Sequence, residues 1–489
     1  MAQDHQPPSS VAAVGQAPSA TRELAGRLRT PEVAAISVGF MGPVMAMSLN
    51  GIGVAGLVGA SVPFTFAVSF LGTMLVAYAF IRLTGYVTHA GSVYALSGVT
   101  LGARAGFFGG FALLGTYLFF AVCIAGACAV FFQAMMAELD LAFADGLWIL
   151  IPVVVGALVL VLNLRESAVT ARTLLAIGMI GILVMLILGV VIVVRVASGS
   201  APVVSTGLDL STLAPGGAPL SAIMTASVFG FLSWAGFESG TSLSEEAEDP
   251  RKTIPRALGA AVVLAGLIYT FMMFAQTIGF GTDEAGVAAF AGASSTLTTL
   301  SSTYIGAWFA VLISVIAFLV AFASLLSSTA AAARLLFALA RDGFGPAVLA
   351  RTSPSTGVPG PAVVLVTAFT VIVACLSGVL GAGSVDVYYW FATIATLCMV
   401  VAYGMTSVGI IRFILRPGSA VPRWELILPV LGLAYLVFVY AVQIIGQEAP
   451  YTWFPWMAGA WCLIGLIIVI ARPALAERIG KRMTAEDLG

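Results

Sequence analysis

Long runs of apolar residues, separated by short polar breaks, dominate the chain from residue 33 to residue 471. Most runs are long enough for a helix to cross the hydrocarbon core of a bilayer, which takes about 20 residues. The breaks carry proline, glycine and charge, as in the segment DPRK at 249–252. The pattern predicts twelve membrane-spanning helices, at residues 33–59, 62–82, 107–137, 147–163, 171–195, 221–244, 257–280, 303–333, 361–380, 387–411, 425–445 and 454–471.

The composition agrees with a multi-pass membrane protein and excludes soluble classes. Of 489 residues, 60% are hydrophobic and 9% are charged, whereas a soluble globular domain has about 25% charged residues. The net charge of −1 gives no basic field for nucleic acid. All five cysteines fall in apolar runs, and His5 and His89 lie outside the predicted spans. We therefore expect no disulfide framework, no metal site and no cofactor.

The basic residues predict the orientation of the chain. Twenty of the 21 Lys and Arg residues fall in the two tails or in the loops on the same side as the tails, and Arg195 falls on the other side. Because cytoplasmic loops carry an excess of Lys and Arg, we expect both termini in the cytoplasm. Residues 1–30 are rich in Pro, Ser and Ala and lack the pattern of a signal peptide, so they are expected to form a disordered cytoplasmic tail.

Predicted spans 1 and 6 both contain interruptions. Span 1 carries Gly42-Pro43, and span 6 carries glycines at 230, 236 and 240. Proline breaks helical hydrogen bonding, although glycines alone often only let helices pack closely. The two spans lie five apart, as expected if spans 1–5 and 6–10 are related halves, and paired interruptions of this kind indicate a transporter binding site. The exposed N–H and C=O groups of broken helices suit a carboxylate and an ammonium group.

Glu238 is the one carboxylate well inside a predicted span. Such a group costs about 2.5–3.5 kcal/mol on insertion scales and is functional by default. It is interpreted as a partner for an ammonium group, a proton carrier or a gating link between helices, and the alternative is an internally hydrogen-bonded structural acid. Tyr117 in span 3 is a second polar candidate for the same cavity, with a packed tyrosine as the equal alternative.

Three motifs resemble those of the amino acid–polyamine–organocation (APC) superfamily of permeases, which have the LeuT-type inverted-repeat fold. The first combines GFE at 236–238, the pair Glu245-Glu246 and DPRKTIPRA at 249–257. The second is ARLLFALARDG at 333–343, and the third is AGSVY at 90–94. The resemblance covers about residues 32–445.

The resemblance implies an all-α membrane protein with twelve transmembrane helices. These form a 5+5 inverted repeat (31–196 and 221–412) with broken helices 1 and 6, then helices 11 and 12 (424–472) and a cytoplasmic tail (473–489). It also implies a midplane substrate site, where Phe231 or Trp234 is expected to act as a movable lid. The residues expected to bind substrate are Met41, Gly42, Pro43, Val44, Met45, Ala46, Tyr117, Phe231, Ser233, Trp234, Ala235 and Gly236.

The resemblance further implies a set of coupling or gating residues, namely Glu238, Glu245, Glu246, Arg334 and Arg341. We expect Glu245 or Glu246 to pair with Arg334 or Arg341 and to close the cytoplasmic side in one state. The alternative is an ordinary solvated run of charges at the membrane surface.

The chain departs from the family pattern at two places. The usual Gly-Ser-Gly of span 1 is replaced by Pro-Val-Met at 43–45, so fewer free amides meet a carboxylate, and amines without one remain candidates. Span 5 lacks the lysine that some members use for proton coupling, so Glu238 is the better candidate. Hydroxyls at Ser324, Ser327, Ser328 and Thr329 lie where sodium-coupled relatives bind Na⁺, but back-bonding within the helix is the favoured interpretation. The expected coupling ion is H⁺ in preference to Na⁺.

The sequence therefore predicts a secondary-active transporter that moves a small amino acid or related amine across the cytoplasmic membrane by alternating access. It is expected to be a monomer or homodimer in the lipid bilayer, and not an enzyme, because no nucleophile–base constellation is present. The alternatives are a polyamine- or ethanolamine-type amine permease or a substrate exchanger. A channel is less favoured, because no span repeats polar residues along one face.

Overall fold

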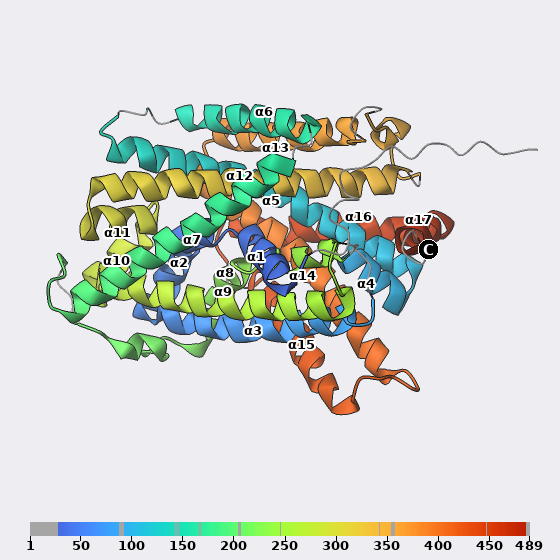
Figure 1. The fold of residues 1–489 in the computed structure, drawn as a ribbon, viewed down its shortest axis with the longest axis horizontal. Helices are drawn as coiled ribbons and strands as arrows, with labels where there is room; N and C mark the ends of the chain where they lie inside the picture. Colours follow the sequence, from blue (N-terminus) through green and yellow to red (C-terminus); the bar gives the residue numbers. More distant parts are fainter. Residues whose placement is uncertain are drawn as a thin grey trace, which may run out of the picture.

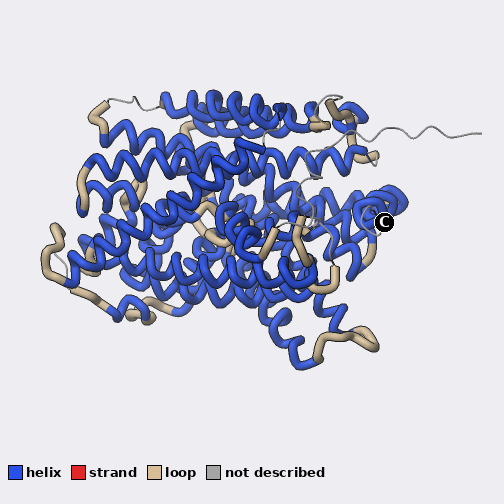
Figure 2. Tube along the Cα trace, in the orientation of Figure 1, coloured by secondary structure: helices blue, strands red, loops and turns tan. Residues whose placement is uncertain are grey.

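The computed structural model describes residues 28–87, 92–141, 144, 146–165, 168–203, 207–244, 246–341, 343–353, 357–445 and 447–485. Within these ranges the fold is helical (Figure 2). The one β contact among the described residues is an isolated parallel bridge between Leu28 and Ala247. The α-helices are α1 (Thr30–Phe40), α2 (Pro43–Val58), α3 (Val62–Thr84), α4 (Ser92–Leu101), α5 (Ala103–Glu138), α6 (Leu150–Arg165), α7 (Ala168–Ala197), α8 (Leu220–Leu232), α9 (Pro250–Phe280), α10 (Glu284–Ala291), α11 (Thr296–Tyr304), α12 (Ala307–Arg341), α13 (Gly360–Val379), α14 (Ser384–Leu415), α15 (Ile427–Val442), α16 (Phe454–Ala471) and α17 (Pro473–Ala485).

Eleven helical stretches of the described chain are long and apolar enough to cross a membrane. Ten of them overlap predicted spans 3 to 12, with ends that differ by at most eight residues. The other, Pro43–Thr84, has 42 residues, which at 1.5 Å per residue is about 60 Å, or twice the thickness of a bilayer core. It is interrupted between α2 and α3 at Gly59, whose backbone has φ 60° and ψ −132°. This stretch covers the second half of predicted span 1 and all of predicted span 2.

Two further interruptions occur where the sequence pattern predicts them. Between α1 and α2, Gly42 adopts a left-handed conformation (φ 61°), and Pro43 occupies the first position of α2, where a helix needs no N–H donor. After α8, the chain turns at Gly236 (φ 92°) and continues as the 3₁₀ helix η5 (Phe237–Leu243). Each break therefore rests on a glycine in a conformation that other residues rarely adopt.

The helices pack around α5, which contacts α14, α12 and α4. On one side of the bundle α6 lies along α13, and on the opposite side α3 lies along α9 (Figure 1). The short helix α1 packs against α9 and η5, while α2 packs against α8. Both interruptions are consequently inside the bundle, between these two sides.

Helix α15 contacts α3 closely at three places along its length. A Cβ atom at Gly72 would lie 2.4 Å from the Tyr435 ring, and one at Gly432 would lie 2.7 Å from the backbone oxygen of Leu75. Glycine at both places lets the two helices approach closely. At the end of α3, Arg82 donates from Nε and Nη2 to the Glu425 carboxylate, at 2.9 Å and 2.8 Å.

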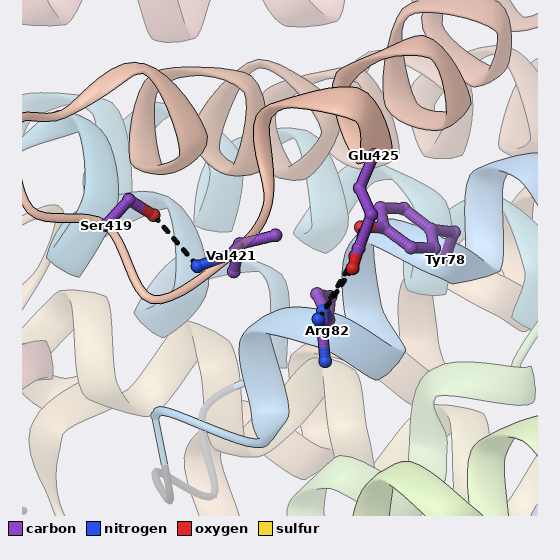
Figure 3. Close-up of polar contacts among 5 residues, drawn as sticks. All are labelled: Tyr78, Arg82, Ser419, Val421 and Glu425. Carbon is purple, nitrogen blue, oxygen red and sulfur yellow. Dashed lines mark hydrogen bonds and ion pairs between the residues drawn. The ribbon is translucent and has the colours of Figure 1, made fainter.

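Glu425 lies in η7 (Arg423–Leu426), just before α15, and its carboxylate also accepts a hydrogen bond from the Tyr78 hydroxyl (Figure 3). The preceding loop is turned by Ser419, whose Oγ accepts a hydrogen bond from the Val421 N–H at 3.3 Å (Figure 3). The bidentate guanidinium–carboxylate geometry is the strong form of such a pair.

Both ends of the described chain contact the bundle. The Leu28 N–H donates to the Glu246 oxygen at 2.9 Å, and the Leu28 oxygen accepts from the Glu248 N–H at 3.0 Å. Residues 28–30, which the sequence assigns to the disordered tail, are thus part of the fold, whereas residues 1–27 lie outside the described ranges. At the other end, α17 packs on α5, with an ion pair of 3.3 Å between Glu477 and Arg104.

Candidate functional site

A cavity lies where the two helix interruptions meet. Its empty volume, which includes space open to solvent, is about 550 Å³. The lining comes from α1, α2, α5, α8 and the following turn, η5, α12 and α14. The lining residues are Phe40, Met41, Met45, Ala46, Asn50, Thr116, Tyr117, Phe120, Cys123, Ile124, Leu232, Ala235, Gly236, Glu238, Ser324, Ser328, Tyr388 and Met399.

The structure brings together seven of the residues that the sequence assigned to substrate binding or coupling. Those that line the cavity are Met41, Met45, Ala46, Tyr117, Ala235, Gly236 and Glu238. Gly42, Pro43 and Val44 are not among the lining residues. Val44 instead faces α7, since a Cβ atom at Gly181 would lie 3.0 Å from its Cγ2. The loop between α1 and α2 therefore presents only some of its side chains to the cavity.

The predicted aromatic lid residues pack elsewhere. Trp234 stacks on Phe70 with ring centroids 6.1 Å apart, and its indole N–H donates to the Val262 oxygen at 3.4 Å. Phe231 meets the Tyr435 ring edge to face, with ring centroids 5.8 Å apart. Neither residue, nor Ser233, is in the cavity lining. Both rings are buried against α3, α9 and α15 instead.

Glu238 is buried in the first turn of η5, with an exposed fraction of 2%. Its carboxylate accepts a hydrogen bond from the Tyr403 hydroxyl of α14. The Tyr403 ring is held in turn by edge-to-face contacts with Phe80 and Phe237, at centroid distances of 5.0 Å and 5.5 Å. Among the described residues, no Lys or Arg forms an ion pair with Glu238. The site thus holds a carboxyl group whose protein partner is neutral.

The broken helix α1–α2 offers few free amides to the cavity. The N–H of Met41 donates to Ser37 at 3.3 Å, that of Gly42 donates to Gly39 at 3.2 Å, and that of Ala46 donates to Gly42 at 2.9 Å. Pro43 has no N–H. Within residues 41–46, only the N–H groups of residues 44 and 45 lack a backbone acceptor. The N-terminus of α2 therefore has little capacity to bind an anion.

The end of α8 offers carbonyl groups instead. Tight turns direct the N–H groups of Ser233, Trp234 and Ala235 back to α8. The carbonyl oxygens of Ser233 and Ala235 accept no backbone hydrogen bond within the described residues. Of these two residues only Ala235 lines the cavity, so its carbonyl oxygen and the Glu238 carboxylate give this side of the cavity a negative potential that suits a cation.

A polar network beside the cavity links α2 to α9, α11 and α14. Asn50 of α2 donates from Nδ2 to Ser233 Oγ at 2.8 Å, and its Oδ1 accepts from the Tyr388 hydroxyl of α14 at 2.8 Å. Gln276 of α9 and Thr296 of α11 both donate to the Met47 oxygen, at 3.0 Å and 3.1 Å. The sequence-based prediction did not include Asn50, Tyr388 or Tyr403. An amide inside a predicted span was the signal that could have found Asn50.

The hydroxyl groups of α12 are divided between two roles. Ser324 and Ser328 line the cavity, whereas Ser327 Oγ donates back to the Ala323 oxygen at 3.0 Å. The Thr329 hydroxyl is buried without a hydrogen-bond partner among the described residues. Back-bonding is therefore confirmed for Ser327 alone.

Of the other predicted coupling or gating residues, Glu246, Arg334 and Arg341 are not in the cavity lining. Glu246 follows η5, and Arg334 and Arg341 lie on the last turns of α12. The Arg341 guanidinium lies over the Phe337 ring, 5.8 Å from its centroid. Glu245 lies outside the described residues, so the pairing of these acids with the arginines of α12 stays a prediction.

The known proteins that are similar in sequence to this chain are transporters of small molecules, as the cavity also suggests. The chain is 24% identical, over 72% of its length and 75% of the relative, to the low-affinity putrescine importer PlaP of Escherichia coli K12. It is 24% identical, over 91% of its length and 94% of the relative, to the branched-chain amino acid permease BcaP of Lactococcus lactis. It is also 25% identical to the mouse cationic amino acid transporter 4, over 79% of the chain and 60% of the relative.

The family model for amino acid permeases matches residues 28–469. That match includes both helix interruptions, every residue of the cavity lining and all eleven long apolar helical stretches except the last two residues of α16. The chain is therefore a multi-pass membrane transporter that belongs to the amino acid permease family.

Proposed function

We propose that this protein is a secondary-active permease of the cytoplasmic membrane, which moves a small amino acid or related amine by alternating access. The observation that carries the proposal is the cavity at the two helix interruptions, with Glu238 buried in its wall. A buried acid in a membrane protein is functional by default, and midplane sites of transporters form at interrupted helices.

The proposed architecture is a twelve-helix, 5+5 inverted repeat with both termini in the cytoplasm. Residues 31–196 and 221–412 form the two repeats, 424–472 form helices 11 and 12, and 473–489 form a cytoplasmic tail. Supporting this, the stretch Pro43–Thr84 is long enough for two crossings, with α1 extending the first of them. The distribution of Lys and Arg supports the orientation.

In the proposed mechanism, the substrate ammonium group binds between the Glu238 carboxylate and the free carbonyl oxygen of Ala235. Helices α1, α2, α3, α8 and α9 then rock against the remaining helices about this site. Glu238 is also the proposed proton carrier, because Tyr403 supplies only a neutral hydrogen bond to it. Glu246, with Arg334 or Arg341, is the proposed contact that closes the cytoplasmic side. H⁺ is the proposed coupling ion, in symport or antiport.

Reconstituted uptake tests this proposal. Purified protein in vesicles is given a panel of labelled amino acids and amines, while the pH and Na⁺ gradients are set separately. We expect saturable uptake with counterflow, driven by the pH gradient and indifferent to Na⁺. Flux that does not saturate and shows no counterflow would identify a channel and overturn the proposal.

Glu238→Gln tests the assigned role of the acid. The amide keeps the size of the side chain and still accepts the hydrogen bond from Tyr403, but it carries neither charge nor a titratable proton. We expect a loss of uptake of tenfold or more, with an unchanged amount of folded protein by size-exclusion chromatography. Glu284→Gln, on the exposed first turn of α10, is the matched control. Wild-type uptake by Glu238→Gln would remove Glu238 from the mechanism.

A further inference from the structure

The chemistry of the cavity wall narrows the substrate class beyond "amino acid or amine". We infer that the site selects a primary monoamine: one ammonium group on an apolar body, without a carboxylate and without a second charge. This inference rests on the proposed function, since it assigns the transported substrate to the cavity described above. It differs from the substrates named for the relatives, which are amino acids and a diamine.

The first argument is the charge of the lining. Among the described residues that line the cavity, Glu238 is the one acid, and none is basic. One carboxylate balances one ammonium group. A second ammonium group on a diamine would be taken out of water without a partner, and a buried unpaired charge is strongly unfavourable.

The second argument is the shortage of donors for a carboxylate. In the α1–α2 break, the N–H groups of Met41, Gly42 and Ala46 are already bonded to backbone oxygens. Proline at residue 43 removes the next donor, at the place where the first free amide of a helix would otherwise lie. The carboxylate of an amino acid would therefore find no cation in the lining, and the α1–α2 break would supply two backbone amides at most to balance it.

The third argument is the apolar remainder of the wall. Three methionine side chains, from Met41, Met45 and Met399, line the cavity, and methionine adapts its shape to different apolar groups. Phe40, Phe120, Ile124 and Leu232 complete this part of the wall. An alkyl or aromatic body on the amine would be buried here. Each additional buried methylene group should strengthen binding about fourfold, from about 0.8 kcal/mol per group.

Three ligands with the same carbon chain test the inference. Pentylamine is the monoamine, norleucine is pentylamine with a carboxylate on its first carbon, and cadaverine is pentylamine with a second amine on its last carbon. Their dissociation constants are measured by isothermal titration with the full-length protein in detergent. We expect pentylamine to bind at least tenfold more tightly than either of the others, and butylamine to bind about fourfold more weakly than pentylamine.

Variants separate the two parts of the site. Met399→Ala should reduce the gain in affinity from butylamine to pentylamine without improving the binding of norleucine. Met179→Ala, which shortens an exposed methionine on α7, is the matched control and should leave all affinities unchanged. Glu238→Gln should weaken pentylamine binding at least tenfold, and unchanged binding in that variant would overturn the inference.

The outcomes for this inference and for the proposed function are distinct. Norleucine or cadaverine binding as tightly as pentylamine, together with saturable uptake of that ligand, overturns the monoamine assignment and leaves the permease proposal standing. No saturable binding or uptake of any ligand in this series or in the wider panel overturns both.

Discussion

Gly236→Ala is the substitution for which the structure gives the clearest expectation. Gly236 adopts φ 92°, and a Cβ atom there would lie 2.4 Å from Cδ1 and 2.9 Å from Cε1 of the Phe40 ring. The substitution therefore introduces two separate penalties, one in the backbone and one in the packing. Since Phe40 and Gly236 both line the cavity, both penalties act on the binding site.

The size of each penalty follows from its origin. A left-handed backbone costs an L-residue about 1–2 kcal/mol relative to glycine. An extra carbon atom forced into a packed interior typically costs about 1–3 kcal/mol. We therefore expect Gly236→Ala to lower the free energy of unfolding by about 2–5 kcal/mol, and to weaken substrate binding because the Phe40 ring must move into or away from the cavity.

Thermal unfolding in detergent, combined with a double-mutant cycle, measures the two parts. Phe40→Ala in the Gly236→Ala background should restore the stability lost through the steric clash with the Phe40 ring. The stability lost through the left-handed backbone should remain lost. Gly178→Ala on α7 is the control, because a Cβ atom there meets nothing within 4 Å outside its own helix, so stability should rise slightly. Wild-type stability of Gly236→Ala, or no recovery by Phe40→Ala, would refute this reasoning.

Three further predictions concern polar contacts outside the cavity centre. Glu425→Gln should lower the free energy of unfolding by about 1–3 kcal/mol. This is less than the about 3–5 kcal/mol expected when a fully buried ion pair is broken, because the Arg82 side chain is 37% exposed. A double-mutant cycle with Arg82→Gln that gives no coupling energy would contradict this prediction. Tyr388→Phe leaves the buried Asn50 Oδ1 without its donor and should cost about 1–3 kcal/mol in thermal stability; an unchanged midpoint would count against the network. Hydrogen bonds from Lys481 and Arg104 lower the pKa of Glu477 below its ordinary 4.5. The stability from this contact is thus present above pH 4.5 and is lost as the pH falls further, so the protection of α17 amides, taken relative to the intrinsic exchange rate at each pH, should fall in acid in the wild type but not in Glu477→Gln.

The sequence was sufficient to predict the long apolar helices and the interruptions at Gly42 and Gly236, but not the shorter helices α4, α10, α11 and α17. Apolar runs of membrane length identify spans without any homologue, and Gly42-Pro43 and Gly236 each carry a local reason for a break. Glu238 and Tyr117 were predicted for the same reason, since a polar side chain in an apolar run is conspicuous. Both line the cavity.

The rotation of each helix about its axis, which decides which side chains face the cavity, could not be predicted in the same way. In a soluble helix, polar residues identify the solvent side, but lipid and protein core are both apolar, so periodicity gives little information about rotation. The resemblance assigned Phe231 and Trp234 to the cavity, and periodicity could not show that they pack against α3, α9 and α15 instead. Tyr388 and Tyr403 were missed because a tyrosine on α14 looks the same whether it faces lipid, core or substrate.

The interlock of α15 with α3 has a consequence for the membrane around the protein. Close glycine contacts and the Arg82–Glu425 pair should make α3 and α15 move as one body, although α15 also packs on α14. If α3 rocks as proposed, α15 moves with it, and its exposed apolar side chains, including Leu431 and Val437, displace the adjoining acyl chains. A more viscous or thicker bilayer then resists the movement of α15 in each transport cycle. The turnover rate should therefore depend on lipid composition even when the substrate affinity does not.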